Sequence, residues 1–126
     1  STHVKDMGVE EFPDGFLLSE MPLGEGFLNL ERMIAAIRAA RPKTRFTLEM
    51  ITRNPLVVPC LTEKYWATFP ERNGIYLART LKLVQREGHR LQALPRVDQQ
   101  SRQAQLRLED ENVKICLNHA REKLSL

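Results

Sequence analysis

Thr2-His3-Val4-Lys5-Asp6, at the start of the chain, and Phe46-Thr47-Leu48-Glu49-Met50, one predicted helix later, are the stretches that decide the fold. In each of them the side chains are expected to alternate between two faces, as they do in a β-strand. Each also carries a side chain that can bind a metal ion, His3 in the first stretch and Glu49 in the second. A strand, a loop, a helix and a second strand in this order form the unit of parallel α/β folds.

The second stretch is largely apolar on both faces, as expected for a parallel strand that is covered on both sides. Glu49 is the exception, and a carboxylate in such a run must pair with a cation, bind a metal or lie at the solvent end. Two interpretations stay open: an ion pair with Lys5 or Arg53, or a metal-binding carboxylate that also moves a proton. His3 is either a structural histidine bonded to a carboxylate or a metal ligand through its neutral imidazole. Lys5 and Arg53 either orient an oxyanion or sugar hydroxyl, or balance the charges of Asp6 and Glu49.

Two loops are predicted: one precedes the helix that leads into the second strand, and the other follows that strand. Residues 6–28 are rich in glycine and proline and are expected to form one long loop, which in a barrel would lie on the active-site rim. Asn29 is expected to cap a helix that ends at Pro42. The second strand is predicted over residues 45–51, and residues 52–60 are expected to form another loop.

Three further helices are expected after the second strand. They are a short helix over residues 61–69, a longer one over residues 74–88 and a last one over residues 101–123. In the last helix the apolar side chains at helical spacing, which are expected to be buried, are Leu106, Val113, Cys116, Leu117, Ala120 and Leu124. We therefore divide the chain into an α/β part, residues 1–91, and a linker with a helical extension, residues 92–126.

The composition narrows the class of protein. The chain has 126 residues, of which 42% are hydrophobic and 28% charged, so it is of ordinary globular composition but about half the length of an eight-stranded α/β barrel. A net charge of +3 without a run of Lys or Arg argues against nucleic acid as a partner. The sequence has no signal peptide and no apolar stretch long enough to span a bilayer, and its two cysteines fit a reducing compartment. We therefore expect a cytoplasmic protein without a membrane partner.

Three short motifs resemble one enzyme superfamily. His-Val-Lys-Asp at residues 3–6, Pro-Leu-Gly-Glu-Gly at residues 22–26 and Thr-Leu-Glu-Met at residues 47–50 are similar to the last two strand–helix units of the xylose-isomerase-like TIM barrels. This superfamily holds the sugar phosphate isomerases and epimerases. The resemblance covers about residues 1–55, and residues 73–79 are similar to an extension that a subset of these proteins carries. It implies the C-terminal portion of a (β/α)8 TIM barrel with an α-helical extension, and an N-terminal barrel half that is missing from the chain.

The same resemblance implies a function. In such enzymes one divalent metal ion is bound by Glu, Asp, His and Glu from successive strands, and His3 and Glu49 correspond to the last two of these ligands. The implied enzyme is an isomerase or epimerase of a small sugar-like polyhydroxy carbonyl compound, dependent on Mn, Mg, Zn or Co. Glu49 would move the proton, and Lys5 and Arg53 would contact the substrate. The fragment alone is expected to be inactive, because the other two ligands would come from upstream strands.

Other functions stay open. A lyase, dehydratase or decarboxylase on the same scaffold would share the first half-reaction. Abasic-site endonucleases share the barrel but need more histidines and a stronger basic face. A non-catalytic fragment or interaction module is the remaining class. Because two isolated parallel strands leave unpaired edges, such a piece would require the missing barrel half or a homo-oligomer.

Overall fold

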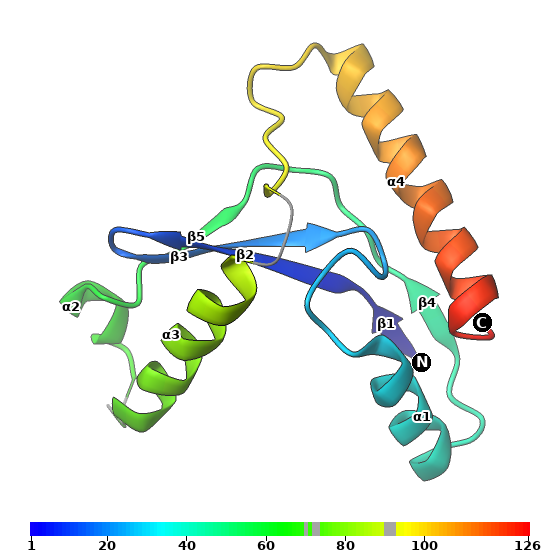
Figure 1. Cartoon of the computed structure of the whole chain (residues 1–126), viewed down its shortest axis with the longest axis horizontal. Helices are drawn as coiled ribbons and strands as arrows, with labels where there is room; N and C mark the ends of the chain where they lie inside the picture. The colour runs from blue at the N-terminus through cyan, green and yellow to red at the C-terminus, as the bar shows by residue number, and fades with distance from the viewer. Residues whose placement is uncertain (70, 72–73, 90–92) are drawn as a thin grey trace.

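The computed structural model describes residues 1–69, 71, 74–89 and 93–126, a mixed α/β arrangement of two small sheets with helices beside them (Figure 1). Among these residues the two sheets do not close into a barrel. Pro70, at the predicted end of the short helix, and Gln92, at the start of the predicted extension, lie outside the described residues. The elements are β1 (Thr2–Val4), β2 (Asp6–Phe12), β3 (Gly15–Met21), α1 (Leu30–Ala40), β4 (Phe46–Leu48), β5 (Leu56–Val58), α2 (Glu63–Trp66), α3 (Gly74–Gly88) and α4 (Arg102–Lys123).

The two stretches that decide the fold pair with each other in parallel. β1 and β4 form a two-stranded sheet in which Thr2 lies opposite Phe46 and Val4 lies opposite Leu48. The backbone N–H of Glu49 donates to the carbonyl oxygen of Val4 at 3.0 Å, so the pairing continues just beyond the strand. The prediction of two parallel strands joined through a helix is therefore confirmed, but the second strand, predicted over residues 45–51, is shortened to the three residues of β4.

The helix between these strands, α1, starts where its cap was expected. The side-chain oxygen of Asn29 accepts the backbone N–H of Arg32 at 3.0 Å and so satisfies one of the free donors at the helix N-terminus. Leu30 and Ile34, one turn apart, are buried against the strands. The helix ends two residues before Pro42, which cannot continue a helical hydrogen-bond pattern.

The predicted long loop over residues 6–28 is wrong, because most of it forms a β-hairpin. β2 and β3 pair in antiparallel fashion from Asp6 opposite Met21 to the tight turn at Pro13-Asp14. Proline at the second position of a turn and Gly15 at the fourth are the residues that a type I turn favours. Only the segment after β3, with its Gly-Glu-Gly sequence, remains a loop that leads into α1.

Two further predictions are corrected and one is confirmed. The predicted loop over residues 52–60 contains β5, which extends the hairpin through antiparallel pairing with β3, Phe16 lying opposite Val58. The helix predicted over residues 61–69 is reduced to the four residues of α2. The helix predicted over residues 74–88 is found as α3.

The last helix, α4, follows its predicted boundaries, but two of its residues face solvent against prediction. The hydroxyl of Ser101 accepts a backbone N–H of the first turn and so caps the helix. Cys116 and Leu124 are buried, as expected, whereas Leu106 and Leu117 are 62% and 41% exposed. The reason is that polar side chains, described below, fix which face of α4 turns inward.

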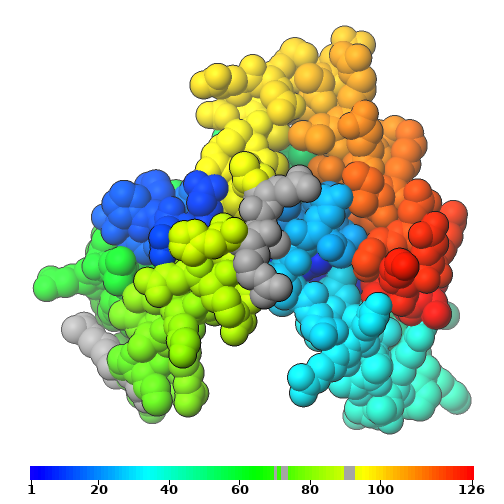
Figure 2. Space-filling model, in the orientation of Figure 1, coloured from blue at the N-terminus to red at the C-terminus, as the bar shows by residue number. Residues whose placement is uncertain are grey.

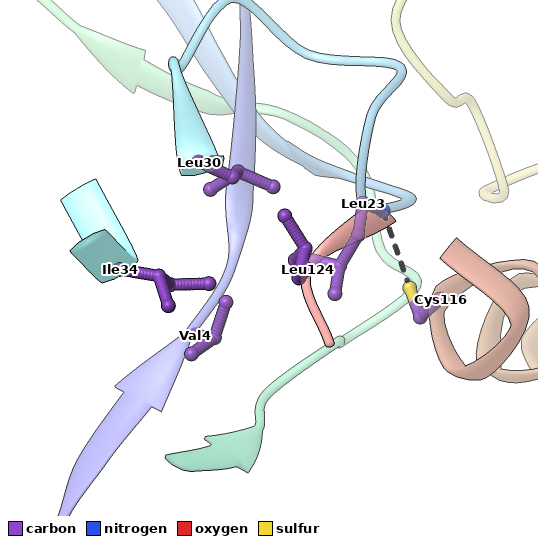
Figure 3. Close-up of a cluster of buried hydrophobic side chains, with 6 residues drawn as sticks. All are labelled: Val4, Leu23, Leu30, Ile34, Cys116 and Leu124. Carbon is purple, nitrogen blue, oxygen red and sulfur yellow. Dashed lines mark hydrogen bonds between the residues drawn. The ribbon is translucent and has the colours of Figure 1, made fainter. Parts of the chain in front are cut away.

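One hydrophobic cluster joins both ends of the chain. Leu23, in the loop after β3, donates its backbone N–H to the sulfur of Cys116 at 3.3 Å, as the dashed line in Figure 3 shows. The C-terminal end of α4 thereby packs on the same core as β1 and α1, and the two termini lie near each other (Figure 1). The buried members of this cluster are Val4, Leu23, Leu30, Ile34, Cys116 and Leu124.

A second cluster packs α3 against the hairpin. Val9 from β2, Phe16 from β3 and Val84 from α3 are buried together with Cys60. In the space-filling view, α3 and α1, coloured yellow-green and cyan, form separate lobes on the visible face, and α4 lies along another side in orange and red (Figure 2). None of the described helices has a segment that is both long and apolar enough to cross a lipid bilayer.

Candidate functional site

His3 and Glu49, the two predicted metal ligands, lie in contact. The parallel register of β1 and β4 places His3 opposite Thr47, so that Glu49 follows at the end of its strand on the same side. Nδ1 of His3 lies 2.5 Å from Oε2 of Glu49. Both side chains are partly open to solvent, 60% for His3 and 30% for Glu49, so an incoming ligand can reach them.

Lys5, a predicted substrate-binding residue, lies beside this pair. Its ammonium group donates to Oε1 of Glu49, the carboxylate oxygen that His3 does not contact. The same ammonium group lies 3.4 Å from Oε1 of Glu20, on the neighbouring strand β3. The side chain of Lys5 therefore lies between two carboxylates.

The charges of this cluster shift the pKa values of two of its members. The hydrogen bond from Lys5 and, after it, the hydrogen bond from His3 lower the pKa of Glu49 below its ordinary value of 4.5. The hydrogen bond to Glu49 raises the pKa of Lys5 above 10.5, against the opposing effect of desolvation. At neutral pH the site therefore holds a carboxylate and an ammonium ion in contact.

Glu20 is the member of the cluster that is not among the residues predicted from the sequence. Its side chain is buried, at 4% exposure, and its Oε2 accepts the backbone N–H of Ile51 at 2.7 Å. Arg53, the second predicted substrate-binding residue, lies with Nη2 3.5 Å from Oε1 of Glu20. Arg53 thus reaches the cluster through Glu20, and the ion pair with Glu49 that the sequence left open for it is not formed among the described residues.

The backbone that follows Glu49 is held from two sides. Glu20 binds it at Ile51 from the hairpin, and Glu109 of α4 accepts the backbone N–H of Thr52 at 2.8 Å. The amide of Asn112, also on α4, donates to the hydroxyl of Thr52 at 2.9 Å. Polar side chains from the hairpin and from α4 therefore fix the segment that carries Glu49.

Asp6, which the sequence placed near these charges, has a different role. Its carboxylate is fully buried and accepts backbone N–H groups of Met7, Gly24, Gly26 and Leu28 at 2.9–3.1 Å. A Cβ atom on Gly26 would lie 2.1 Å from Oδ1 of Asp6, so the loop can approach the carboxylate this closely only with glycine. Asp6 thus anchors the loop after β3, and Lys5 is not needed to balance its charge.

The cluster supplies two donors of the kind that divalent metals bind. Imidazole nitrogen and carboxylate oxygen are both ligands for Mn, Zn and Co, and here they lie together on an accessible surface. The donor chemistry of His3 and Glu49 therefore fits a divalent cation, and further ligands would have to come from elsewhere. The described residues contain no group of three or more His, Cys, Asp or Glu that could hold a metal ion.

Comparisons with known proteins find no relative of this chain. No family model matches the sequence, and neither a curated protein sequence nor a solved structure is similar to it.

Proposed function

We propose that this chain forms part of a divalent-metal-dependent isomerase or epimerase that acts on a small polyhydroxy carbonyl compound, a sugar or sugar phosphate. The observation that supports the proposal is the contact between the imidazole of His3 and the carboxylate of Glu49, which are 46 positions apart in sequence and meet on adjacent parallel strands. In a parallel α/β fold, ligands bind at the carboxyl ends of the strands, where these two side chains lie. β1 and β4 would then be neighbouring strands of a (β/α)8 barrel, with the other strands supplied by its N-terminal half.

His3 and Glu49 would hold the metal ion together with ligands from outside the described residues. A divalent cation at this position would supply Lewis acidity toward a carbonyl or hydroxyl oxygen. In place of the contact between Nδ1 of His3 and Oε2 of Glu49, each of the two groups would offer a lone pair to the cation. The lowered pKa of Glu49 keeps this group ionised at neutral pH, as a metal ligand and a proton acceptor must be.

Glu49 would take the proton from the carbon next to the carbonyl group and return it to the same or the adjacent carbon. Lys5 and Arg53 would bind an oxyanion, phosphate or hydroxyl group of the substrate, since both cations lie at the edge of the cluster at 34% and 61% exposure. The two cysteines are both free and buried, which supports the reducing cytoplasm as the compartment.

The test is proton exchange in deuterated buffer. The full-length protein with Mn²⁺ is incubated with a panel of ketoses and ketose phosphates, and the products are followed by NMR. We expect incorporation of deuterium at a carbon next to the carbonyl group, and its loss in the variants His3→Ala and Glu49→Gln. The variant Glu31→Gln, which changes an exposed carboxylate in the first turn of α1, is the matched control and should keep the activity.

The outcome also separates the related reactions. A product that has lost water or carbon dioxide would assign a lyase, dehydratase or decarboxylase on the same scaffold. If no substrate of the panel exchanged a carbon-bound proton and none was converted, the proposal would have to be abandoned.

A further inference from the structure

One end of the molecule carries a concentration of positive charge that the composition does not reveal. Residues 38–45 and residues 119–126 together hold six Lys or Arg side chains and one carboxylate, Glu122, which gives a formal net charge of +5. The whole chain has a net charge of +3, so the remaining residues carry −2. These carboxylates elsewhere hide the excess, which is why the composition alone argues against a nucleic-acid partner. We call this set the basic end, and its cations are Arg38, Arg41, Lys43, Arg45, Arg121 and Lys123.

The structure brings these two segments together. The guanidinium group of Arg38 donates to the carbonyl oxygen of Ser125 at 2.8 Å and lies 5.7 Å from the centre of the Phe46 ring. Arg121 of α4 and Phe46 line the same hollow. Figure 1 shows the C-terminus beside β4, the strand that follows the turn after α1. The end of α1, this turn and the end of α4 therefore meet at one end of the molecule.

The cations of the basic end have no carboxylate partner. All six are exposed, and none of them forms an ion pair with another described residue. The ion pairs within the described part of the chain involve other cations, namely His3, Lys5, Arg53, Arg86, Arg96 and Lys114. The negative ends of the α1 and α4 dipoles lie at the basic end, but they amount to only about half a charge each. Most of the positive potential therefore remains available to a partner from outside.

A regular array of phosphate groups fits this surface. Four of the six cations are arginines, whose planar guanidinium groups bind phosphate oxygens with two parallel hydrogen bonds. A nucleic-acid duplex presents about one negative charge per 1.7 Å of its axis, the array that such a group of cations neutralises best.

Two other polyanions fit less well. Single strands are held in part by stacking of their bases on exposed aromatic rings, whereas Phe46, the ring that contacts the basic end, is half-buried beneath Arg38. Peripheral membrane proteins insert several apolar side chains beside their cations. Within residues 38–45 and 119–126, the only large apolar side chain that is exposed is Leu126, at 38%.

We propose that the basic end binds the phosphate backbone of a nucleic-acid duplex without reading its base sequence. This inference goes beyond the proposed function and does not rest on it. The turn after α1 lies at the amino ends of the parallel strands β1 and β4, whereas Glu49 follows the carboxyl end of β4. The duplex therefore binds away from His3 and Glu49, and replacing either of them leaves duplex binding unchanged.

The experiment measures binding of the protein to a fluorescein-labelled DNA duplex of about 20 base pairs by fluorescence anisotropy over a range of KCl concentrations. The first test variant, Arg41→Gln with Lys43→Gln, removes two exposed charges from the turn. The second, Arg121→Gln with Lys123→Gln, removes two from the end of α4. The matched control, Arg79→Gln with Lys82→Gln, removes two exposed charges from α3, which forms a separate lobe (Figure 2). All three double variants have the same net charge.

The wild type should bind the duplex with a Kd of about 10 µM or tighter at about 50 mM KCl. The logarithm of its association constant should fall with the logarithm of the salt concentration with a slope of about −4, as expected when about four of the six cations contact phosphates. Each test variant should reduce the magnitude of this slope by about 2 and weaken binding at least about tenfold, to the same extent for duplexes of unrelated sequence. The control should change the slope by less than about 0.5.

Three outcomes would overturn the proposal. One is the absence of duplex binding by the wild type at about 50 mM KCl. Another is an equal effect of the control and the test variants, because net charge and not this surface would then be responsible. The third is binding to vesicles of phosphatidylserine and phosphatidylcholine without binding to the duplex, which would assign the basic end to a membrane surface. Duplex binding and deuterium exchange are measured separately, so this inference and the proposed function can each fail alone.

Discussion

Replacing Asp6 with asparagine should destabilise the protein strongly, although the change alters the shape of the side chain very little. The carboxylate of Asp6 is fully buried and accepts four backbone N–H groups, two on each oxygen. Asparagine has one oxygen and an NH2 group in place of the other. Whichever way the amide is turned, two backbone N–H groups then face a donor in place of an acceptor.

The size of the effect follows from these lost bonds. Two hydrogen bonds to a charged group, at about 1.5–3 kcal/mol each, correspond to about 3–6 kcal/mol. A neutral amide costs less to bury than a carboxylate, which brings the expected loss in the free energy of unfolding to about 3 kcal/mol. For a domain of this size, that loss lowers the melting temperature by about 10–20 °C.

The assay is urea unfolding followed by circular dichroism, with Asp6→Asn compared with Glu25→Gln. Glu25 is exposed in the same loop, so its change from carboxylate to amide should alter the free energy of unfolding by less than about 0.5 kcal/mol. Amide hydrogen exchange should also accelerate at Gly24 and Gly26 in Asp6→Asn, because their acceptor is weakened. A loss below about 1 kcal/mol, or one equal to that of Glu25→Gln, would refute the structural role assigned to Asp6.

Three further predictions concern the same framework. Because the pKa of Glu49 is lowered in the folded state, its contribution to stability is present above the ordinary value of 4.5 and is lost as the pH falls through the folded-state pKa. Lys5→Met should raise the pKa of Glu49 in an NMR titration, and an unchanged value would contradict the ion pair. Gly26→Ala should cost at least about 2 kcal/mol in urea unfolding, because the added Cβ would overlap with the carboxylate of Asp6, and near-wild-type stability would argue against this close approach. Burial raises the pKa of the Cys116 thiol, so a disulfide reagent should modify it at least about 100-fold more slowly in the native than in the unfolded protein; rapid native modification would show that the core is open there.

The parallel strands and α1 are predictable because their signals are local. Alternation over a few residues predicts which side of a strand is apolar, and Val4 and Leu48 indeed face the core while Glu49 does not. Asn29 caps α1 as its position before an apolar helical run indicates. In each case the residues that decide the structure lie within one helical turn or one strand of each other.

The hairpin of β2 and β3 is not predicted, because the turn residues indicate only a chain reversal when the residues before and after them are not considered as strands. Proline, aspartate and glycine at positions 13–15 indicate a turn, and the apolar residues on either side, such as Val9 and Leu17, could have indicated two paired strands. The glutamates of β2 interrupt that pattern, since the last three residues of the strand are partly buried or exposed whichever face they occupy. Glu20 is missed for the same reason, because a carboxylate in a loop needs no partner, whereas a buried one in a strand does.

The orientation of α4 shows why hydrophobic periodicity alone did not suffice. Leu106 and Leu117 face solvent, whereas Asn112 is buried on the inner face one turn before Cys116. The inner face of the helix is polar where it meets the segment after β4, because that segment offers the backbone N–H and the hydroxyl of Thr52, which need polar partners. Among the described residues, the apolar side chains that this part of the chain packs on the core of β1 and α1 are Cys116, Ala120 and Leu124, all at the C-terminal end of α4. A helix that covers a loop must therefore turn polar residues inward, and in this chain the same residues fix the backbone that carries Glu49.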